Sequence, residues 1–385
     1  MTLKQLILIF VVVFFIQCKN NKDIEEIISS VQKEFVPDSR EGIFLIKSFN
    51  KNQKILLKGE TDNKEAYAKL LQSLKDKGYN IEDSISLLPA DTSAPWALVT
   101  VSAANMRLNP SHDAEMGTQA LMGTPLRILK EDDGWLLVQT PDKYLSWIEE
   151  DVVETLSQDA FEKWRNSERV FVTAWFEFLR DTSSNLVVSN VTAGCILQQS
   201  SETKDSYVVF TPDGRKGILP KKSAVDFKLW KENTLPETGK ILETARMMMG
   251  TPYLWGGTSI KGVDCSGFVK TVYFLNGCIL ARDASLQALY GKDIPFNNDF
   301  EFNPGDLVFF GRHAKDDKPE RITHVGLFLG DSEFIHSSGM VKINSFDSTR
   351  ANYSRYRTIS LLKVRRILGN MDTQGIQSVK NHPWY

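Results

Sequence analysis

Residues 262–268 read "GVDCSGF", with Cys265 between an aspartate and a serine. From Phe268 to Leu275 apolar side chains recur at helical spacing, and Gly277 ends the pattern. The sequence therefore predicts a helix that begins at or near Cys265. Unpaired backbone N–H groups and the positive end of the helix dipole favour the thiolate form of a cysteine at that position. A thiolate there would be a strong nucleophile.

Two histidines lie on predicted strands of the same segment. His324 is in "THVGLFLG" and His336 is in "EFIHSSG". A hairpin of these strands would bring them side by side, so that one ring faces the cysteine and the other orients it. The chain has five histidines, and we expect the other three, His112, His313 and His382, at the surface.

Residue type and spacing leave three interpretations of Cys265, His324 and His336. The three side chains could bind zinc, although ligands from a helix start and two neighbouring strands match no common spacing motif. They could be structural residues of a core. We favour the third interpretation, a cysteine hydrolase, because it gives each side chain a role.

The composition is that of an ordinary globular protein. Hydrophobic residues make up 42% and charged residues 24% of 385 residues, so the chain can form several packed cores. Lys and Arg number 46 against 48 Asp and Glu, and the net charge of −2 lacks the basic footprint of a nucleic-acid-binding protein. We therefore expect a multidomain protein without a nucleic-acid partner.

Turn residues and hydrophobic patterns divide the chain into four segments after its N-terminus. Strands and one helix predict a small α+β domain at 24–90. Short strands between Gly, Pro and Asp turns predict a barrel at 94–155, where "GTPLRILKEDDGWLLVQTPDKYLSWI" resembles a bacterial SH3-like domain. We expect a second SH3-like barrel at 168–226. Helices followed by strands predict an α+β domain at 239–368.

The N-terminus has the pattern of a signal peptide. Lys4 precedes an apolar run from Leu6 to Ile16, which is too short to span a bilayer but has the length of a signal-peptide core. Cys18 follows and resembles the lipid acceptor of a bacterial lipoprotein. We therefore expect a signal peptide at 1–18, export to the periplasm or cell envelope, and a membrane anchor through Cys18. The alternative is an ordinary signal peptide that is cleaved nearby.

The remaining cysteines show no disulfide or metal framework. Cys195, Cys265 and Cys278 are odd in number, and no two of them are spaced as C-x-x-C. Apolar neighbours favour a buried structural role for Cys195 and Cys278.

Four stretches of the last segment resemble one enzyme family when they are taken together. "GTPYLWGG", "GVDCSGFV", "FNPGDLVFF" and "ITHVGLFLGDSEFIHSSG" occur in the order seen in NlpC-type cysteine peptidases, which are papain-like bacterial cell-wall hydrolases. The resemblance covers about residues 245–368. It implies Cys265 as nucleophile, His324 as general base and His336 as the polar third residue, with Tyr253 as the family tyrosine near the nucleophile. It also implies hydrolysis of the γ-D-glutamyl to diamino-acid bond (meso-diaminopimelate or L-Lys) in peptidoglycan stem peptides, without a metal or cofactor.

Further stretches resemble the dipeptidyl-peptidase VI branch of this family. They are "NMRLNPSHDAEMGTQALMG" and "YLSW" in the first barrel and "RDASLQ" in the last segment. In that branch the first SH3-like domain blocks one end of the cleft, and the substrate needs a free N-terminal L-Ala. The resemblance implies that Glu115, Tyr144 and Asp283 bind this ammonium, which would be costly to bury without such partners. The alternative for each of the three is a solvated surface residue, and without the resemblance we would prefer that alternative for Glu115.

Three residues close to these motifs complete the expected substrate site. Asp264 and Ser266 flank the nucleophile and are expected to line the substrate-binding side. Ala284 stands where some relatives have serine, so we expect Ser285 to contact the D-glutamate carboxylate instead. The expected partners are peptidoglycan-derived peptides, with L-Ala-D-Glu as product, and the expected oligomeric state is a monomer.

Other functions remain open at this point. A wall endopeptidase would use the same chemistry on intact peptidoglycan, with the SH3-like pair as wall-binding modules. A catalytically inactive wall-binding lipoprotein would keep the fold alone. A related transferase or amidase would act on another acyl group.

Overall fold

The structure, a computed structural model, describes residues 22–51, 54–89, 93–296 and 302–385. It divides into two compact units, one up to residue 92 and one from Ser93 to Tyr385. The predicted signal peptide and Cys18 lie outside the described residues. Within the described part of the chain, no helix is both long and apolar enough to cross a membrane.

The first unit is a three-stranded sheet with helices. Its elements are a helix at 22–35, β1 Phe44–Lys51, β2 Lys54–Thr61, α2 Lys64–Asp76 and β3 Ile81–Leu87. Strand β2 pairs antiparallel with β1 and parallel with β3, and α2 makes the crossover between β2 and β3. The side chain of Asn63 caps α2 by accepting a hydrogen bond from the Ala66 N–H. The sequence did not predict the helix at 22–35, which buries Ile24, Ile28 and Val31 at helical spacing.

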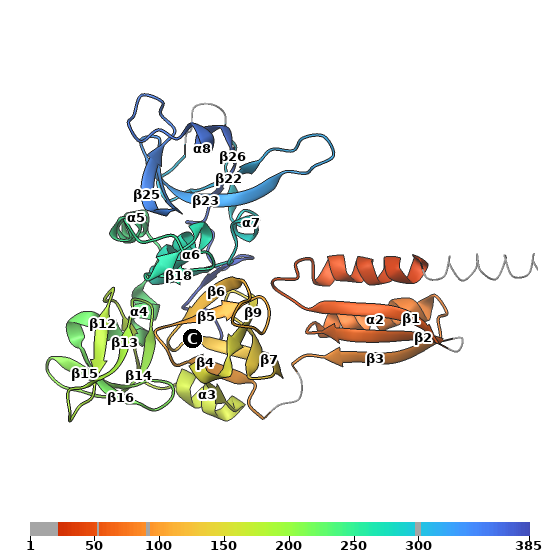
Figure 1. The fold of residues 1–385 in the computed structure, drawn as a ribbon, viewed down its shortest axis with the longest axis horizontal. Helices are drawn as coiled ribbons and strands as arrows, with labels where there is room; N and C mark the ends of the chain where they lie inside the picture. Colours follow the sequence, from red (N-terminus) through yellow and green to blue (C-terminus); the bar gives the residue numbers. More distant parts are fainter. Residues whose placement is uncertain (1–21, 52–53, 90–92, 297–301) are drawn as a thin grey trace, which may run out of the picture. The chain divides into compact units, whose positions relative to one another are not determined.

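Two sheets of seven strands follow in the second unit (Figure 1, yellow and green). The first is built from β4 Trp96–Val99, β5 Ala103–Arg107, β6 Met116–Leu121, β7 Pro125–Asp132, β8 Trp135–Gln139, β9 Leu145–Glu149 and β10 Val153–Leu156, and η1 Glu150–Val152 and α3 Gln158–Arg165 flank its last strand. The second is built from β11 Arg169–Val172, β12 Glu177–Arg180, β13 Val187–Val191, β14 Ile196–Glu202, β15 Ser206–Phe210, β16 Lys216–Pro220 and β17 Ala224–Asp226, with η2 Lys221–Ser223 before β17 and α4 Phe227–Asn233 after it.

The two sheets share one topology. The first has the strand order β10-β4-β7-β8-β9-β5-β6, and the second, read from its other end, has β17-β11-β14-β15-β16-β12-β13. When the strands of each sheet are numbered in chain order, the two spatial orders are identical. The chain therefore builds the same β fold twice, although the two segments differ in sequence.

The rest of the second unit is a helix packed on an antiparallel sheet (Figure 1, green-blue to blue). Its elements are α5 Thr238–Met247, β18 Thr258–Ser259, β19 Gly262–Val263, α6 Cys265–Leu275, β20 Cys278–Leu280, α7 Ala284–Gln287, β21 Lys292–Asp293, β22 Leu307–Arg312, β23 Arg321–Gly330, β24 Glu333–Ser338, β25 Met340–Ser345, α8 Arg355–Ile359, β26 Leu361–Arg366 and β27 Ile376–Ser378. The sheet has the order β21-β26-β22-β23-β24-β25, and α6 contacts β23 and β24. Phe268 and Val272 of α6 pack with Leu327 and Ile335 of these strands. This packing sets the start of α6 against the middle of the sheet.

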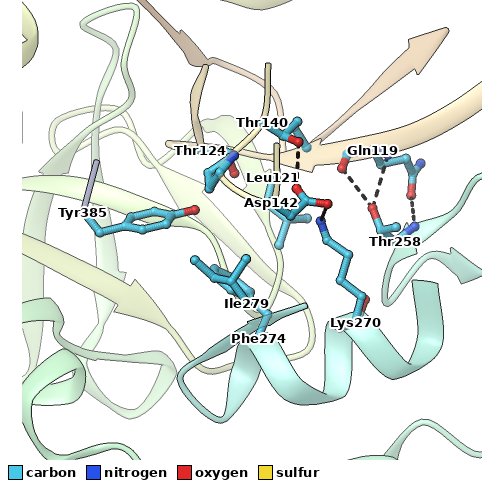
Figure 2. Close-up of a pocket in the computed structure, with 13 residues that line it drawn as sticks. Gln119, Leu121, Thr124, Thr140, Asp142, Thr258, Lys270, Phe274, Ile279 and Tyr385 are labelled. Carbon is cyan, nitrogen blue, oxygen red and sulfur yellow. Dashed lines mark hydrogen bonds and ion pairs between the residues drawn. The ribbon is translucent and has the colours of Figure 1, made fainter. Parts of the chain in front are cut away.

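Helix α6 also contacts the first seven-stranded sheet, β4 to β10, which we call the first barrel. The contact is a buried polar interface (Figure 2). Lys270 extends from α6 to Asp142, with Nζ 2.8 Å from Oδ2. Nearby, the main chain and side chain of Gln119 in β6 exchange hydrogen bonds of 2.9–3.2 Å with Thr258. A cavity of ≈ 60 Å³ lies between these groups, and Tyr385 closes one side of it. The barrel is therefore joined to the helix that carries Cys265.

The end of the described chain folds back onto this interface. The sequence predicts His382 at the surface, but its side chain is buried, and its Nε2 lies 3.0 Å from the carbonyl oxygen of Pro141. The prediction was wrong because the partner lies far away in the sequence, so no local pattern reveals it.

Candidate active site

Cys265 is the first residue of α6, as the sequence predicts. Asp264 caps the helix: its Oδ1 accepts a hydrogen bond from the Gly267 N–H at 2.7 Å, and its Oδ2 accepts one from the Gly256 N–H at 3.0 Å. Position 267 has to be glycine, because a Cβ there would lie 1.9 Å from the carbonyl oxygen of Gly257. The "DCSG" motif is therefore a helix start pressed closely against the preceding loop. The thiol of Cys265 is 8% exposed.

Arg282 connects the nucleophile helix to the first barrel, although sequence reasoning assigned it no role. Its side chain is 1% exposed, and Nη2 lies 2.5 Å from Asp264 Oδ2. Its Nη1 donates to the hydroxyl of Ser266 at 3.0 Å, and its Nε donates to Thr118 Oγ1 of β6, also at 3.0 Å. The only signal in the sequence was its place at the start of "RDASLQ".

These contacts bear on two of the expected substrate ligands. The carboxylate of Asp264 is engaged by Arg282 and by two backbone N–H groups, and the hydroxyl of Ser266 lies between Arg282 and Asp264. Both side chains are buried. Their polar atoms therefore have partners within the protein, and binding of substrate by either residue stays a prediction.

His324 on β23 and His336 on β24 lie side by side, as the predicted hairpin requires. Nε2 of His324 is 2.7 Å from Nδ1 of His336, and Nε2 of His336 is 2.8 Å from Oδ1 of Asn344 on β25. The amide nitrogen of Asn344 donates to the carbonyl oxygen of Asn352 at 2.9 Å, which turns its oxygen toward the histidine. The sequence reasoning missed Asn344, whose only signal is a polar residue on the strand beside His336.

This row of contacts fixes the tautomers of both rings. Because the Asn344 oxygen can only accept, the proton of neutral His336 is on Nε2, and its Nδ1 is an acceptor. His324 must then carry its proton on Nε2, which leaves a lone pair on Nδ1. The short approach of the two ring nitrogens leaves no space for an ion between them, and among the described residues no group of three or more His, Cys, Asp and Glu could hold a metal ion. His324 can therefore act as a base.

The first barrel meets the loop that leads to Cys265. Trp255 donates a hydrogen bond from its Nε1 to Oε1 of Glu115 at 2.7 Å, and the Trp255 side chain is 61% exposed. Gly256 has a φ of +77°, and a Cβ there would lie 2.4 Å from the carbonyl oxygen of Met116. Only glycine allows this approach, which sets Glu115 beside the loop.

Two of the other expected substrate ligands, Tyr144 and Asp283, act electrostatically on Arg282. Burial lowers the pKa of Arg282, but the charge and hydrogen bond of Asp264, with smaller effects of Asp283 and Tyr144, raise it by more. Asp283 precedes α7, Ser285 is in its first turn, and Tyr144 is buried in the barrel with its ring against Gly117. Tyr144 and Asp283 thus lie on the Arg282 side of the site, while Glu115 has Trp255 as its partner.

Comparison with known proteins now identifies the family. A model described as the NlpC/P60 family matches residues 250–363, and one described as the bacterial dipeptidyl-peptidase Sh3 domain matches residues 106–152. A γ-D-glutamyl-L-lysine dipeptidyl-peptidase of Bacillus cereus is 31% identical over 58% of this chain and 67% of its own. The chain belongs to the NlpC/P60 family of cysteine peptidases.

Further similar proteins extend the match into the first barrel. Dipeptidyl-peptidase 6 of Lysinibacillus sphaericus is 28% identical over 67% of this chain and 94% of its own. The crystal structure of an NlpC/P60 family protein from Bacillus cereus covers 70% of this chain and 99% of its own, with a TM-score of 0.60 and 23% identity. The SH3-like domain and the NlpC/P60 domain therefore occur together in related proteins, and the fold is shared.

Burial of the thiol of this NlpC/P60 domain opposes the helix-start effect that the sequence predicts. Burial, followed by the nearby charge of Asp264, raises the pKa of Cys265 to about 11. Hydrogen bonds from the backbone N–H groups of Val325 and Ser266 act in the opposite direction and favour the thiolate. The backbone N–H groups at the helix start therefore act as predicted, and burial is the opposing effect that local sequence does not reveal.

Burial also acts against the charged forms of the two histidines and of Tyr253 in the NlpC/P60 site. Burial, together with the charge of Arg357, lowers the pKa of His324 well below its ordinary value, and burial lowers the pKa of His336 to about 4. Burial, followed by the influence of Cys265, raises the pKa of the half-buried Tyr253 to about 12, so its hydroxyl is kept as a donor near the thiol. A neutral thiol beside a neutral base is the arrangement that these shifts favour.

Proposed function

We propose that this chain is a γ-D-glutamyl-L-diamino-acid endopeptidase. Its substrates would be peptidoglycan stem peptides with a free N-terminal L-Ala, and its product would be L-Ala-D-Glu. The names of the two relatives support this activity class, and one of them names a γ-D-glutamyl-L-lysine substrate. The acyl-transfer chemistry is supported by the place of Cys265 at the start of α6 and by the contact between His324 and His336.

The catalytic steps follow from the tautomers. Sγ of Cys265 attacks the γ-carbonyl carbon of D-Glu while its proton passes to Nδ1 of His324. Backbone N–H groups at the start of α6 and the hydroxyl of Tyr253 stabilise the oxyanion. The imidazolium of His324 then protonates the leaving amine, and a thioester to L-Ala-D-Glu remains on Cys265. His324 takes a proton from water while hydroxide adds to the thioester carbon. The C–S bond then breaks and releases L-Ala-D-Glu, and the imidazolium of His324 returns the proton to Sγ of Cys265.

The observation that carries the dipeptidyl-peptidase assignment is the contact between Glu115 and Trp255. It holds an acidic side chain of the first barrel beside the loop that leads to Cys265. An ammonium group bound at this boundary would meet the carboxylate of Glu115, with Tyr144 and Asp283 as further ligands near Arg282. The substrate would thus be limited to two residues before the scissile bond. We propose Ser285 as the ligand of the D-glutamate carboxylate.

A pair of peptides tests this proposal. The purified protein and its Cys265→Ala variant would be incubated with L-Ala-γ-D-Glu-L-Lys and with the same peptide acetylated at alanine, and products would be identified by mass. We expect cleavage of the free peptide alone, and no cleavage by the variant. Equal cleavage of both peptides would contradict the requirement for a free amine and would favour an endopeptidase of intact peptidoglycan. A diaminopimelate peptide would determine which diamino acid is preferred.

We also propose a two-barrel organisation and an exported location. The shared strand order supports an SH3-like assignment for the barrel at 168–226 as well as for the one at 94–155. The apolar run and Cys18 of the N-terminal sequence support a lipid-anchored protein of the cell envelope. We propose in addition that the protein is a monomer. Labelling with a fatty-acid probe, lost in Cys18→Ser, and sedimentation of the unanchored protein would test these proposals.

A further inference from the structure

Arg357 lies beside the catalytic residues and is assigned no role by the mechanism above. It belongs to α8, and its Cζ lies 5.4 Å from the ring centroid of Phe310. Phe310 on β22 pairs with His324 on β23, and the two ring centroids are 5.8 Å apart. Burial lowers the pKa of Arg357, and Tyr356, Cys265 and Tyr253 act electrostatically against this effect, so they lie near the guanidinium. The guanidinium therefore lies on the histidine side of the nucleophile.

Arg357 differs from the other half-buried or buried arginines of this domain. Arg282, Arg350, Arg365 and Arg366 form ion pairs with Asp264, Glu333, Asp293 and Asp306, respectively. The guanidinium of Arg357 is half-buried, yet within the ranges that the structure describes it forms no ion pair and no hydrogen bond, and the rings of Phe310 and Tyr356 lie against it. A partly desolvated cation without an anion is unfavourable in the free protein. An anionic ligand would remove this cost.

The position of Arg357 is also unfavourable for the general base, and this argues against a purely structural role. Its charge lowers the pKa of both His324 and His336. Lys342, which pairs with His336 across β24 and β25, acts in the same direction. The histidine side of the site is therefore cationic, whereas Glu115 and Asp283 make the barrel side acidic. A peptide with an amine at one end and a carboxylate at the other matches this distribution.

We propose that Arg357 binds the free carboxylate of the diamino acid in the leaving fragment, so that the preferred substrate is a tripeptide that ends at the diamino acid. This inference rests on the proposed function. The leaving amine must lie on the side of His324, because His324 protonates it. A carboxylate on the same residue then comes within reach of a guanidinium that is one aromatic ring away from that base, and a bidentate pair can form.

The test is a two-by-two comparison of kcat/KM. The substrates are L-Ala-γ-D-Glu-L-Lys and its C-terminal amide, because lysine carries a single carboxylate. The proteins are the wild type and Arg357→Gln, with Arg355→Gln as a matched control from an exposed position of the same helix. A third peptide, with D-isoglutamine in place of D-Glu, removes the other carboxylate near the scissile bond.

We expect amidation to lower kcat/KM of the wild type by roughly ten- to hundred-fold. For Arg357→Gln, kcat/KM on the free peptide should fall by a similar factor and should equal kcat/KM on the amide. Arg355→Gln should behave as wild type on both peptides. Equal losses of Arg357→Gln on both peptides would overturn the proposal, because Arg357 would then act through the histidines. The proposal would also be overturned if Arg357→Gln lost only the discrimination between the D-Glu and D-isoglutamine peptides. Arg357 would then bind the carboxylate of D-Glu on the acyl side of the scissile bond. Failure of the wild type on every peptide would instead overturn the proposed function.

Discussion

Asn344 accepts a hydrogen bond from His336 at 2.8 Å, and this contact determines which nitrogen of His324 is free to take a proton. The amide cannot reverse without losing its own hydrogen bond to the carbonyl oxygen of Asn352. The basic nitrogen of the site is therefore set by a residue that lies two strands away from His324 and touches neither the thiol nor the substrate.

Two replacements of Asn344 should distinguish its effect on the tautomer of His336 from an effect on the protonation of His336. Asn344→Leu removes the acceptor, so His336 can adopt the other tautomer, and kcat should fall by roughly 10²-fold. Asn344→Asp keeps an acceptor and adds a charge that favours the protonated form of His336, so the acidic limb of the kcat–pH profile should move to higher pH. A variant Asn344→Leu with unchanged kcat would contradict the positioning role.

Stability should depend on pH through the buried histidines. An unfolded histidine has a pKa near 6.5, whereas burial lowers the pKa of His336 to about 4. Between these values the unfolded chain binds more protons, so the free energy of unfolding should fall as the pH falls from about 6.5 towards 4. His336 alone would contribute on the order of 3 kcal/mol, and His324 and His382, whose pKa values are also lowered by burial, should add to this.

Urea unfolding at pH 7 and pH 5 measures this dependence. The variant His382→Asn should show a shallower pH dependence than the wild type, because one of the three contributing groups is gone. Equal stability of the wild type at the two pH values would show that these rings are not buried as neutral groups.

The ion pair between Lys270 and Asp142 should contribute more to the free energy of unfolding than an exposed ion pair does. Lys270→Met leaves a buried carboxylate without its cation, and the loss should be about 3–5 kcal/mol of unfolding free energy. Removing both charges with Lys270→Met and Asp142→Leu should restore much of it. Lys240→Met is the matched control, because its pair with Glu237 is exposed and should contribute less than about 1 kcal/mol. Similar losses for the two single variants would contradict the burial argument.

Gly256→Ala tests whether the close approach of barrel and loop selects the substrate. Gly250 and Gly256 both have positive φ, but only at Gly256 would a Cβ meet the other domain, at the carbonyl oxygen of Met116. Both alanine variants carry backbone strain of about 1 kcal/mol. Gly256→Ala should in addition raise the cleavage of the acetylated peptide relative to the free one. The same ratio in both variants would mean that this contact does not set selection.

Local patterns predict much of the fold and the reactive groups. The start of α6 at Cys265 follows from its apolar spacing, and the hairpin of His324 and His336 follows from two short strands. Local patterns did not predict the long-range contacts. Arg282 donates a hydrogen bond across the interface to Thr118, and His382 is buried against Pro141. The effect of burial on the pKa of Cys265 was also beyond local patterns, because burial depends on the whole domain and opposes the backbone N–H groups at the helix start.

The return of the chain end to the first barrel has a consequence for the order of folding during synthesis. His382 contacts Pro141 across a separation of 241 residues, and β27 pairs with β20. Every residue of the site from Cys265 to Asn344 is therefore made before the segment that contacts Pro141 and β20 is available. Non-local contacts of this kind form late. A nascent chain thus holds its nucleophile and base on a scaffold that still lacks these contacts, and they can form only after residues 376–385 have left the ribosome.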